Sequence, residues 1–68
     1  MLFSERILRL RQEAGLSQRK IAEELGLSLL GYQRYEMGTS KPNFDKLIAL
    51  CDFFNVSADY LLGRTDKP

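Results

Sequence analysis

The chain contains 68 residues, of which 44% are hydrophobic and 28% are charged, and its formal net charge is +1. This length leaves room for one domain only, and the hydrophobic fraction is ordinary for a globular fold and argues against disorder. No stretch approaches the ~20 consecutive apolar residues of a membrane span, and no basic segment followed by an apolar run marks a secretion signal.

Side chains that carry reactive or metal-binding groups are scarce. Cys51 is the only cysteine and there is no histidine, so the sequence offers neither an internal disulfide nor a zinc site. Cys51 shares one helical face with Leu47, Leu50 and Phe54, which indicates a small core residue. There is no glycine-rich phosphate loop and no Ser or Cys with a base at catalytic spacing. We therefore expect no enzyme activity, no metal and no cofactor.

The first helix is expected over residues 3–14. Ser4 is a candidate N-cap, and Glu5 suits the positive end of a helix. The apolar residues of the buried stripe recur at i, i+3 and i+7 and are Ile7, Leu10 and Ala14. Gly15 follows and is expected to end the helix.

Two shorter helices, over residues 17–25 and 28–37, are predicted to be joined by a tight turn. Ser17 is a good N-cap for the first of them. Gly26 comes just past its last apolar residue, where a left-handed backbone ends a helix at little cost. Ser28 offers a second N-cap. This order of cap, helix, glycine, cap and helix is a helix-turn-helix pattern.

The second of these two helices has distinct inner and outer faces. Tyr32 and Tyr35 lie at i and i+3, and aromatic residues at helical spacing usually pack in the core. We expect both rings to face inward. The outward positions are Leu29, Leu30, Gln33 and Arg34.

A loop and a fourth helix are predicted next. Residues 37–43 contain Gly, Thr and Ser, together with Pro42, which disfavours helix at the residue before it. Asn43 caps a helix expected over 44–54. Asn55 suits a left-handed position at the end of that helix. The inner face is expected to be Leu47, Leu50, Cys51 and Phe54, widened by Ile48.

A short last helix is expected over residues 58–62, capped by Ser57 and closed by Gly63. Residues 64–68 contain no hydrophobic residue and are expected to form a frayed tail. The sequence shows no strand alternation, no internal repeat and no low-complexity run. It therefore predicts one all-α domain over residues 1–63.

The motifs of this chain resemble the Cro and lambda-repressor family of bacterial and phage DNA-binding regulators. Five matching segments keep the order and spacing of that family and together are specific; they are GLSQ (15–18), IAEELGLS (21–28), YQRYEMG (32–38), KPNFDKL (41–47) and FNVSADYLLG (54–63). The resemblance implies a compact five-helix, lambda-repressor-like fold. It also implies a bacterial or phage-encoded protein of the cytoplasm.

The resemblance implies sequence-specific binding of double-stranded DNA by a transcriptional regulator, with repression favoured over activation. The helix that starts at Ser28 would lie in the major groove. Family members read bases at the positions of Leu29, Leu30 and Arg34, with Gln33 beside them. Chemically, arginine can donate two hydrogen bonds to guanine and glutamine can pair with adenine, although both are also ordinary on a solvated helix face.

Other residues receive supporting roles from the same resemblance. Arg11 is expected to form an ion pair with Glu36, since a partly buried carboxylate needs such a partner. Relatives bind pseudo-palindromic operators as homodimers, and the dimer contact is expected to include Phe53, Val56 and Ala58. Nothing points to a membrane or a small-molecule ligand. Phosphate contacts, which set register and affinity, are expected from Ser17, Gln18, Arg19, Ser28, Thr39, Ser40 and Lys41.

Leu29 and Leu30 depart from the family pattern, which often has polar side chains at these positions. Leucine can press against a thymine methyl group but cannot form a hydrogen bond with a base. Gly31 weakens the helix and would let the backbone approach DNA closely. The alternative is a protein-interaction module, of the antitoxin or anti-repressor type, that uses Leu29 and Leu30 as an apolar anchor.

Overall fold

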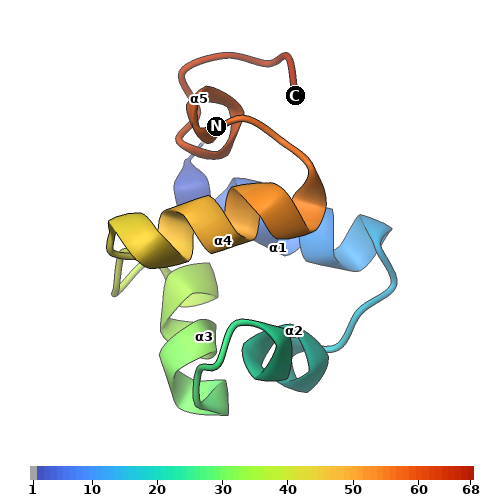
Figure 1. Cartoon of the computed structure of the whole chain (residues 1–68), viewed down its shortest axis with the longest axis vertical. Coiled ribbons are helices and arrows are strands. Elements are labelled where there is room, and N and C mark those ends of the chain that lie inside the picture. The colour runs from blue at the N-terminus through green and yellow to red at the C-terminus, as the bar shows by residue number, and fades with distance from the viewer. Residues whose placement is uncertain (1) are drawn as a thin grey trace.

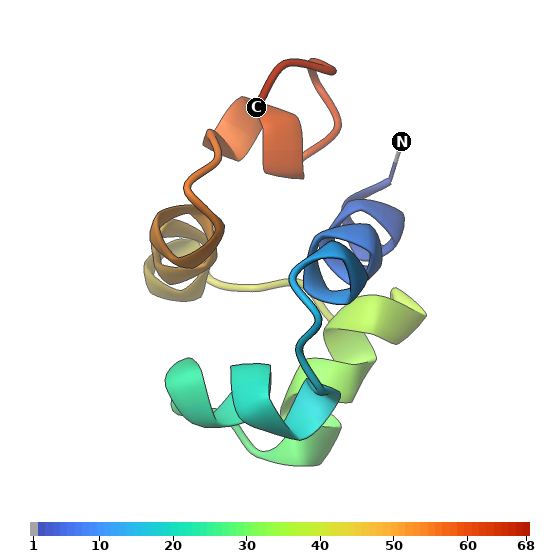
Figure 2. The ribbon, with the colours of Figure 1, turned by 90° about the vertical axis from the view of Figure 1, so that its right-hand side faces the viewer.

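The computed structural model describes residues 2–68, which form five helices and no strand. Figure 1 shows α4 crossing α1 in the middle of the molecule, with α2 and α3 on one side and α5 and the C-terminus on the other. Figure 2 shows α1 and α4 nearly end-on. The predicted all-α, five-helix fold is confirmed. The helices are α1 (Phe3–Glu13), α2 (Gln18–Glu24), α3 (Leu29–Met37), α4 (Phe44–Phe54) and α5 (Ala58–Leu61).

The described helices are too short and too polar for any of them to cross a membrane. The longest, α1 and α4, have 11 residues each. The whole domain measures 29 × 23 × 19 Å along its principal axes.

Polar caps determine where α2, α3, α4 and α5 begin. Each cap side chain accepts a hydrogen bond from the backbone N–H three residues further on. The distances are 3.0 Å for Ser17, 3.0 Å for Ser28, 2.8 Å for Asn43 and 3.0 Å for Ser57. A left-handed residue follows each of these four helices, for example Gly26 with φ 67° after α2 and Asn55 with φ 56° after α4. The predictions for these caps and helix ends are confirmed.

The start of α1 differs from its prediction. The helix begins at Phe3, so Leu2 is the N-cap and Ser4 already lies inside the first turn. The Leu2 N–H donates to the Glu5 carboxylate at 3.4 Å, and no side chain at the cap position accepts a hydrogen bond. The predicted cap at Ser4 is therefore wrong. Ser4 instead lies beside Gly38 at the end of α3.

One hydrophobic core contains residues from all five helices and Leu25, the residue that directly follows α2. Tyr32 and Tyr35 face inward as predicted and pack edge to face, with ring centroids 6.2 Å apart. Cys51 is partly buried against this core, as expected for a small core residue. The buried members are Ile7, Ile21, Ala22, Leu25, Tyr32, Tyr35, Leu50 and Leu61.

Two residues expected in the core are exposed. Ile48 is 58% exposed because it lies one turn from Phe44 on the outer face of α4, where Phe44 is 84% exposed. Ala14 is exposed because it is the C-cap of α1 and lies beyond the last buried turn. The inner faces of both helices are thus narrower than the apolar pattern predicts.

A buried arginine connects α1 to α5 and the C-terminal residues. Arg6 is only 4% exposed, and its guanidinium lies 3.9 Å from the centre of the Tyr60 ring. It donates to the Thr65 carbonyl and to the Asp66 carboxylate, each at 3.3 Å. The Ser57 N–H donates to the carbonyl of the last residue at 3.0 Å. The segment expected to be frayed thus turns back along α5.

Candidate nucleic-acid interface

A tight turn joins α2 to α3 and sets the angle between the two helices. Gly26 adopts a left-handed backbone, and the Leu27 N–H then reaches the Ala22 carbonyl at 2.9 Å. The Lys46 ammonium, from α4, donates to the Leu25 carbonyl, a group that the end of a helix leaves without an intrahelical partner. The turn is therefore held both by its own backbone and by α4.

α3 presents one face to the core and the opposite face to solvent. Leu30 is 53% exposed and Arg34 is exposed. Leu29 and Gln33 are half-buried. The four residues expected to face outward thus divide into two that are freely accessible and two that are partly covered. Leu30 and Arg34 are the side chains of this group most open to a partner.

Glu36, near the end of α3, is the centre of a hydrogen-bond cluster that draws on three helices. Arg11 of α1 donates from Nε to Oε2 at 2.6 Å and from an Nη nitrogen to Oε1 at 3.2 Å. Gln18 of α2 donates to Oε1 at 2.9 Å. The Tyr32 hydroxyl donates to Oε2. The structure therefore brings together the two residues of the expected ion pair and adds two further donors.

The environment of Glu36 keeps its side chain ionised. Burial acts to raise the pKa of Glu36, but hydrogen bonds from Arg11, Tyr32 and Gln18 outweigh it and hold the pKa below its ordinary value. Burial and the hydrogen bond to Glu36 raise the pKa of the Tyr32 phenol, which stays protonated as the donor. The side chains of Arg11 and Glu36 are 14% and 6% exposed. The cluster is therefore a mostly buried, fully partnered carboxylate.

The cluster extends from Gln18 to the outer face of α3. Gln33 donates from Nε2 to the Oε1 atom of Gln18 at 3.1 Å. From the family resemblance, the sequence predicts a phosphate contact for Gln18 and does not indicate Gln33 as its partner. It also misses the contact of Lys46 with α2, because 21 residues separate Lys46 from Leu25 and no motif links them.

The helix-turn-helix family model matches residues 7–61. The chain belongs to the helix-turn-helix family.

Similar proteins support the same family and the expected resemblance to repressors. The uncharacterized HTH-type transcriptional regulator YobD of Bacillus subtilis is 37% identical over 67 residues, which are 98% of this chain and 60% of YobD. A transcriptional regulator from Listeria innocua has a solved structure with a TM-score of 0.88 and 36% identity, covering 97% of this chain and 62% of that one. The chain thus spans about three fifths of the length of these two proteins.

A third similar protein has been solved with DNA. The P22 c2 repressor protein, in complex with synthetic operator 9T, has a TM-score of 0.85 and 31% identity. The match covers 91% of this chain and 94% of that one. This helix-turn-helix domain therefore has a fold similar to that of the P22 c2 repressor protein.

The residues expected to bind phosphate lie at the start of α2, at the start of α3 and in the α3–α4 loop. At the start of α2, Ser17 and Arg19 are exposed, and Gln18 is half-buried by its bonds to Glu36 and Gln33. The exposed Ser28 uses its hydroxyl to cap α3. In the α3–α4 loop, Ser40 is half-buried and Thr39 and Lys41 are exposed.

The residues expected at a dimer contact lie around the α4–α5 corner. Phe53 is 38% exposed and packs edge-on against Phe54, with ring centroids 5.1 Å apart. Ala58 is exposed, whereas Val56 is half-buried and packs against the core. Phe53 and Ala58 therefore offer more free surface than Val56.

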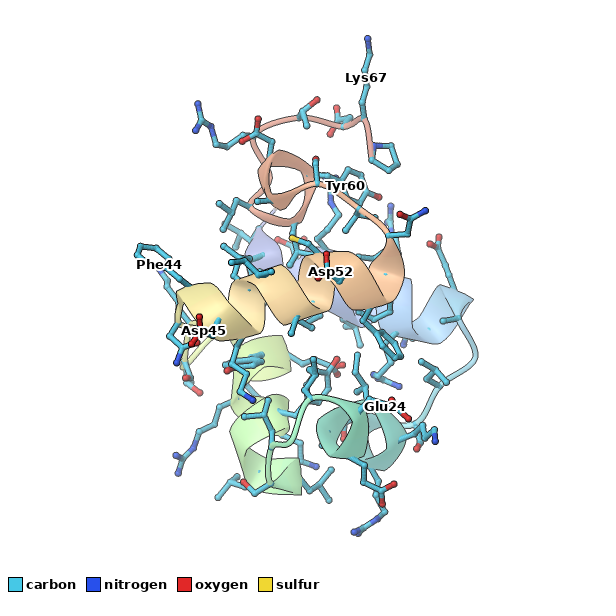
Figure 3. All side chains as sticks on the ribbon, in the orientation of Figure 1. Glu24, Phe44, Asp45, Asp52, Tyr60 and Lys67 are labelled. Carbon is cyan, nitrogen blue, oxygen red and sulfur yellow. The ribbon has the colours of Figure 1, made fainter. Side chains whose placement is uncertain are left out.

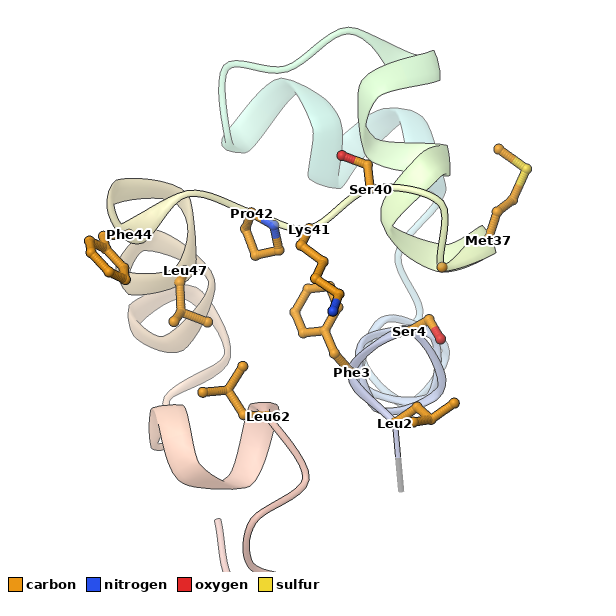
Figure 4. Close-up of a pocket in the computed structure, with 11 residues that line it drawn as sticks. Leu2, Phe3, Ser4, Met37, Ser40, Lys41, Pro42, Phe44, Leu47 and Leu62 are labelled. Atoms are coloured by element: carbon orange, nitrogen blue, oxygen red, sulfur yellow. The ribbon is translucent and has the colours of Figure 1, made fainter.

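An apolar groove that the sequence does not indicate lies between the start of α1, the α3–α4 loop and the start of α4 (Figure 4). Its volume is about 640 Å³. Figure 3 shows Phe44 at the N-terminal end of α4, pointing away from the body of the domain. The lining also includes Leu2 and Met37, which are 68% and 61% exposed. These residues come from separate segments, so no single apolar pattern reveals the groove.

Within residues 2–68, no group of three or more His, Cys, Asp or Glu side chains lies close enough to hold a metal ion.

Proposed function

We propose that this domain binds double-stranded DNA sequence-specifically and regulates transcription as a repressor, with α3 in the major groove. The observation that carries this proposal is that donors from three helices fix Glu36 while Leu30 and Arg34 on the outer face of α3 stay exposed. A rigid helix with a free outer face is what a duplex requires for direct readout. Similarity to a repressor solved with an operator supports the proposal.

The exposed face of α3 would read two kinds of base. The guanidinium of Arg34 can donate two hydrogen bonds to O6 and N7 of guanine. Leu30, with the accessible part of Leu29, can press against thymine methyl groups, which is the contact available to an aliphatic side chain. We therefore expect each half-site to contain a G·C pair beside a thymine-containing step.

Contacts with the DNA backbone would hold α3 in register. We assign phosphate binding to Ser17, Gln18 and Arg19 at the start of α2, to Ser28 at the start of α3, and to residues 39–41 in the α3–α4 loop. Such contacts are independent of sequence and weaken with salt. They complement base readout by the neighbouring helix.

The domain would bind a pseudo-palindromic operator as a homodimer. One domain of this size makes few base contacts, and two copies on half-sites about 34 Å apart double them. We assign the contact between copies to Phe53, Val56 and Ala58. The activity would take place in the cytoplasm of a bacterium, where operator DNA is found.

Selection of bound duplexes from a random pool, followed by salt titration, tests this proposal. We expect two half-sites related by dyad symmetry and an affinity that falls steeply as salt rises. Lys41→Ala should weaken all duplexes alike and reduce the slope of log K against log salt by about 1. Figure 3 shows Lys67 at the far end of the domain from α3, so Lys67→Ala is the matched control and should change neither quantity.

The same titration also tests the alternative function. Absence of duplex binding by the wild-type chain at low salt would overturn the DNA proposal. It would favour a protein-interaction module in which the exposed Leu30 and the half-buried Leu29 form the anchor.

A further inference from the structure

Gln33 belongs to the face of α3 that would meet DNA, yet its side chain is already engaged inside the domain. It is half-buried, and its Nε2 donates to Oε1 of Gln18 at 3.1 Å. Gln18 in turn donates to Glu36 at 2.9 Å. We propose that Gln33 is a positioning residue for Gln18 and does not read a base. This inference rests on the proposed DNA-binding function and deepens it.

The chemistry of the groups fixes the direction of the hydrogen bonds that join Gln33, Gln18 and Glu36. An ionised carboxylate can only accept hydrogen bonds, so Gln18 must turn its NH₂ group toward Glu36. The carbonyl oxygen of the same amide then points to the other side and needs a donor. Gln33 supplies that donor. The order of donors and acceptors is therefore set from Glu36 outward, and neither amide can rotate by half a turn without losing a bond.

This arrangement determines what Gln18 can offer to DNA. A primary amide has two N–H groups, and Glu36 uses one of those on Gln18. The other remains for a phosphate oxygen. The carbonyl oxygen would repel a phosphate, and it is occupied by Gln33. Gln33 therefore improves phosphate binding by keeping the donor side of Gln18 outward, and phosphate contacts carry no sequence information.

Arg34 provides the contrast within the same helix. It is the next residue along α3 and is exposed, and its side chain makes none of the hydrogen bonds or ion pairs found among residues 2–68. A side chain in that state is free to meet a base edge. Gln33 and Arg34 thus have separable effects, on affinity for all duplexes and on base preference respectively.

Binding constants for a panel of duplexes test the assignment. The panel contains the selected site and every single base-pair change in one half-site, measured for wild type, Gln33→Met, Gln18→Ala and the double variant. Gln33→Met keeps the shape of the side chain but removes the amide. We expect it to weaken every duplex by the same factor, about threefold to tenfold. The double variant should be no weaker than Gln18→Ala alone, because Gln33 acts through Gln18.

Arg34→Met is the matched control and should abolish the preference at one base pair. The assignment is overturned if Gln33→Met also removes the preference at a single base pair. It is equally overturned if the losses from Gln33→Met and Gln18→Ala multiply in the double variant. Circular dichroism of each variant establishes that it is folded before binding is measured.

A measurement without DNA separates this inference from the proposed function. In ¹⁵N–¹H spectra, Gln33→Met should shift both side-chain NH₂ signals of Gln18 and leave those of the exposed Gln12 unchanged. Unchanged Gln18 signals would overturn the positioning role. If the wild-type chain binds no duplex, the proposed function fails, while the spectra still decide whether Gln33 holds Gln18.

Discussion

At the scale of single residues, Glu36 connects the three helices that form the site. Its carboxylate accepts hydrogen bonds from Arg11, Gln18 and Tyr32, which belong to α1, α2 and α3. A mostly buried carboxylate without partners would destabilise the fold, whereas a fully partnered one fixes the geometry of its donors. Glu36 therefore holds the start of α2 and the end of α3 at fixed positions.

The stability that Glu36 provides should depend on pH. Because its pKa is lowered from 4.5 in the folded state, its stabilising effect is complete above that pH. The effect is lost as pH falls below 4.5 and through the lowered pKa. We expect Glu36→Gln to reduce the free energy of unfolding by about 3 kcal/mol at pH 7. Urea unfolding from pH 7 to pH 3 should show the gap between wild type and variant narrowing only at the acid end.

The exposed Glu13 offers a control for this experiment, since Glu13→Gln should unfold at the same urea concentration as wild type at pH 7. If the difference in the free energy of unfolding between wild type and Glu36→Gln stayed constant down to pH 3, ionisation of Glu36 would not be its cause.

At the level of the helices, local chemistry at the ends determines where each one starts and stops. Asn55 shows this at the end of α4, where its backbone is left-handed with φ 56°. Residues other than Gly, Asn and Asp rarely adopt this backbone conformation, because their Cβ atom then approaches the carbonyl oxygen. The Val56 N–H can then reach the Cys51 carbonyl at 3.0 Å and close the helix.

Substitutions at Asn55 should therefore separate backbone conformation from side-chain contacts. Asn55→Ala should lower the free energy of unfolding by about 1 kcal/mol, and Asn55→Gly should maintain or increase it. Chemical denaturation of the two variants measures the difference. Equal losses in both would show that the asparagine side chain, and not the left-handed backbone, is what stabilises this position.

The helices could be predicted from the sequence because their signals are local, whereas the contacts between them could not. Ser17 and Ser28 cap backbone groups three residues away, within reach of a motif. Lys46 donates a hydrogen bond to the end of α2 only once α4 has packed against it. Gln33 and Gln18 likewise form their hydrogen bond between two different helices. The Arg11–Glu36 pairing was expected only through the family resemblance. The prediction for Ser4 was wrong because a serine at the second position of a helix gives the same local sequence signal as a serine at the N-cap.

For the molecule as a whole, the C-terminal residues contribute to the fold despite their polar composition. Arg6 directs two hydrogen bonds to Thr65 and Asp66 while its guanidinium lies over Tyr60. A buried guanidinium needs these acceptors, and composition alone does not reveal that a polar tail provides them. Small domains bury limited apolar surface, so such polar contacts provide a large share of the interactions that stabilise the fold.

Removal of residues 64–68 should therefore destabilise the domain. We expect a loss of about 2 kcal/mol in the free energy of unfolding, because the buried Arg6 loses its acceptors. Thermal melts followed by circular dichroism measure this loss. Asp66→Ala is the control and should leave the melting temperature nearly unchanged, since the Asp66 side chain is fully exposed and Thr65 still accepts from Arg6. An unchanged melting temperature for the shortened chain would contradict this role of the tail.

The exposure of Leu30 and Arg34 has a practical consequence for protein engineering. Neither side chain belongs to the hydrophobic core or to the cluster around Glu36. Under the proposed DNA-binding function, exchanging both for other amino acids should retarget the domain to a new DNA sequence while keeping its melting temperature. Leu29 and Gln33 do not offer the same freedom, because each is partly covered by the scaffold. A library for altered specificity should therefore vary positions 30 and 34 first and leave their neighbours untouched.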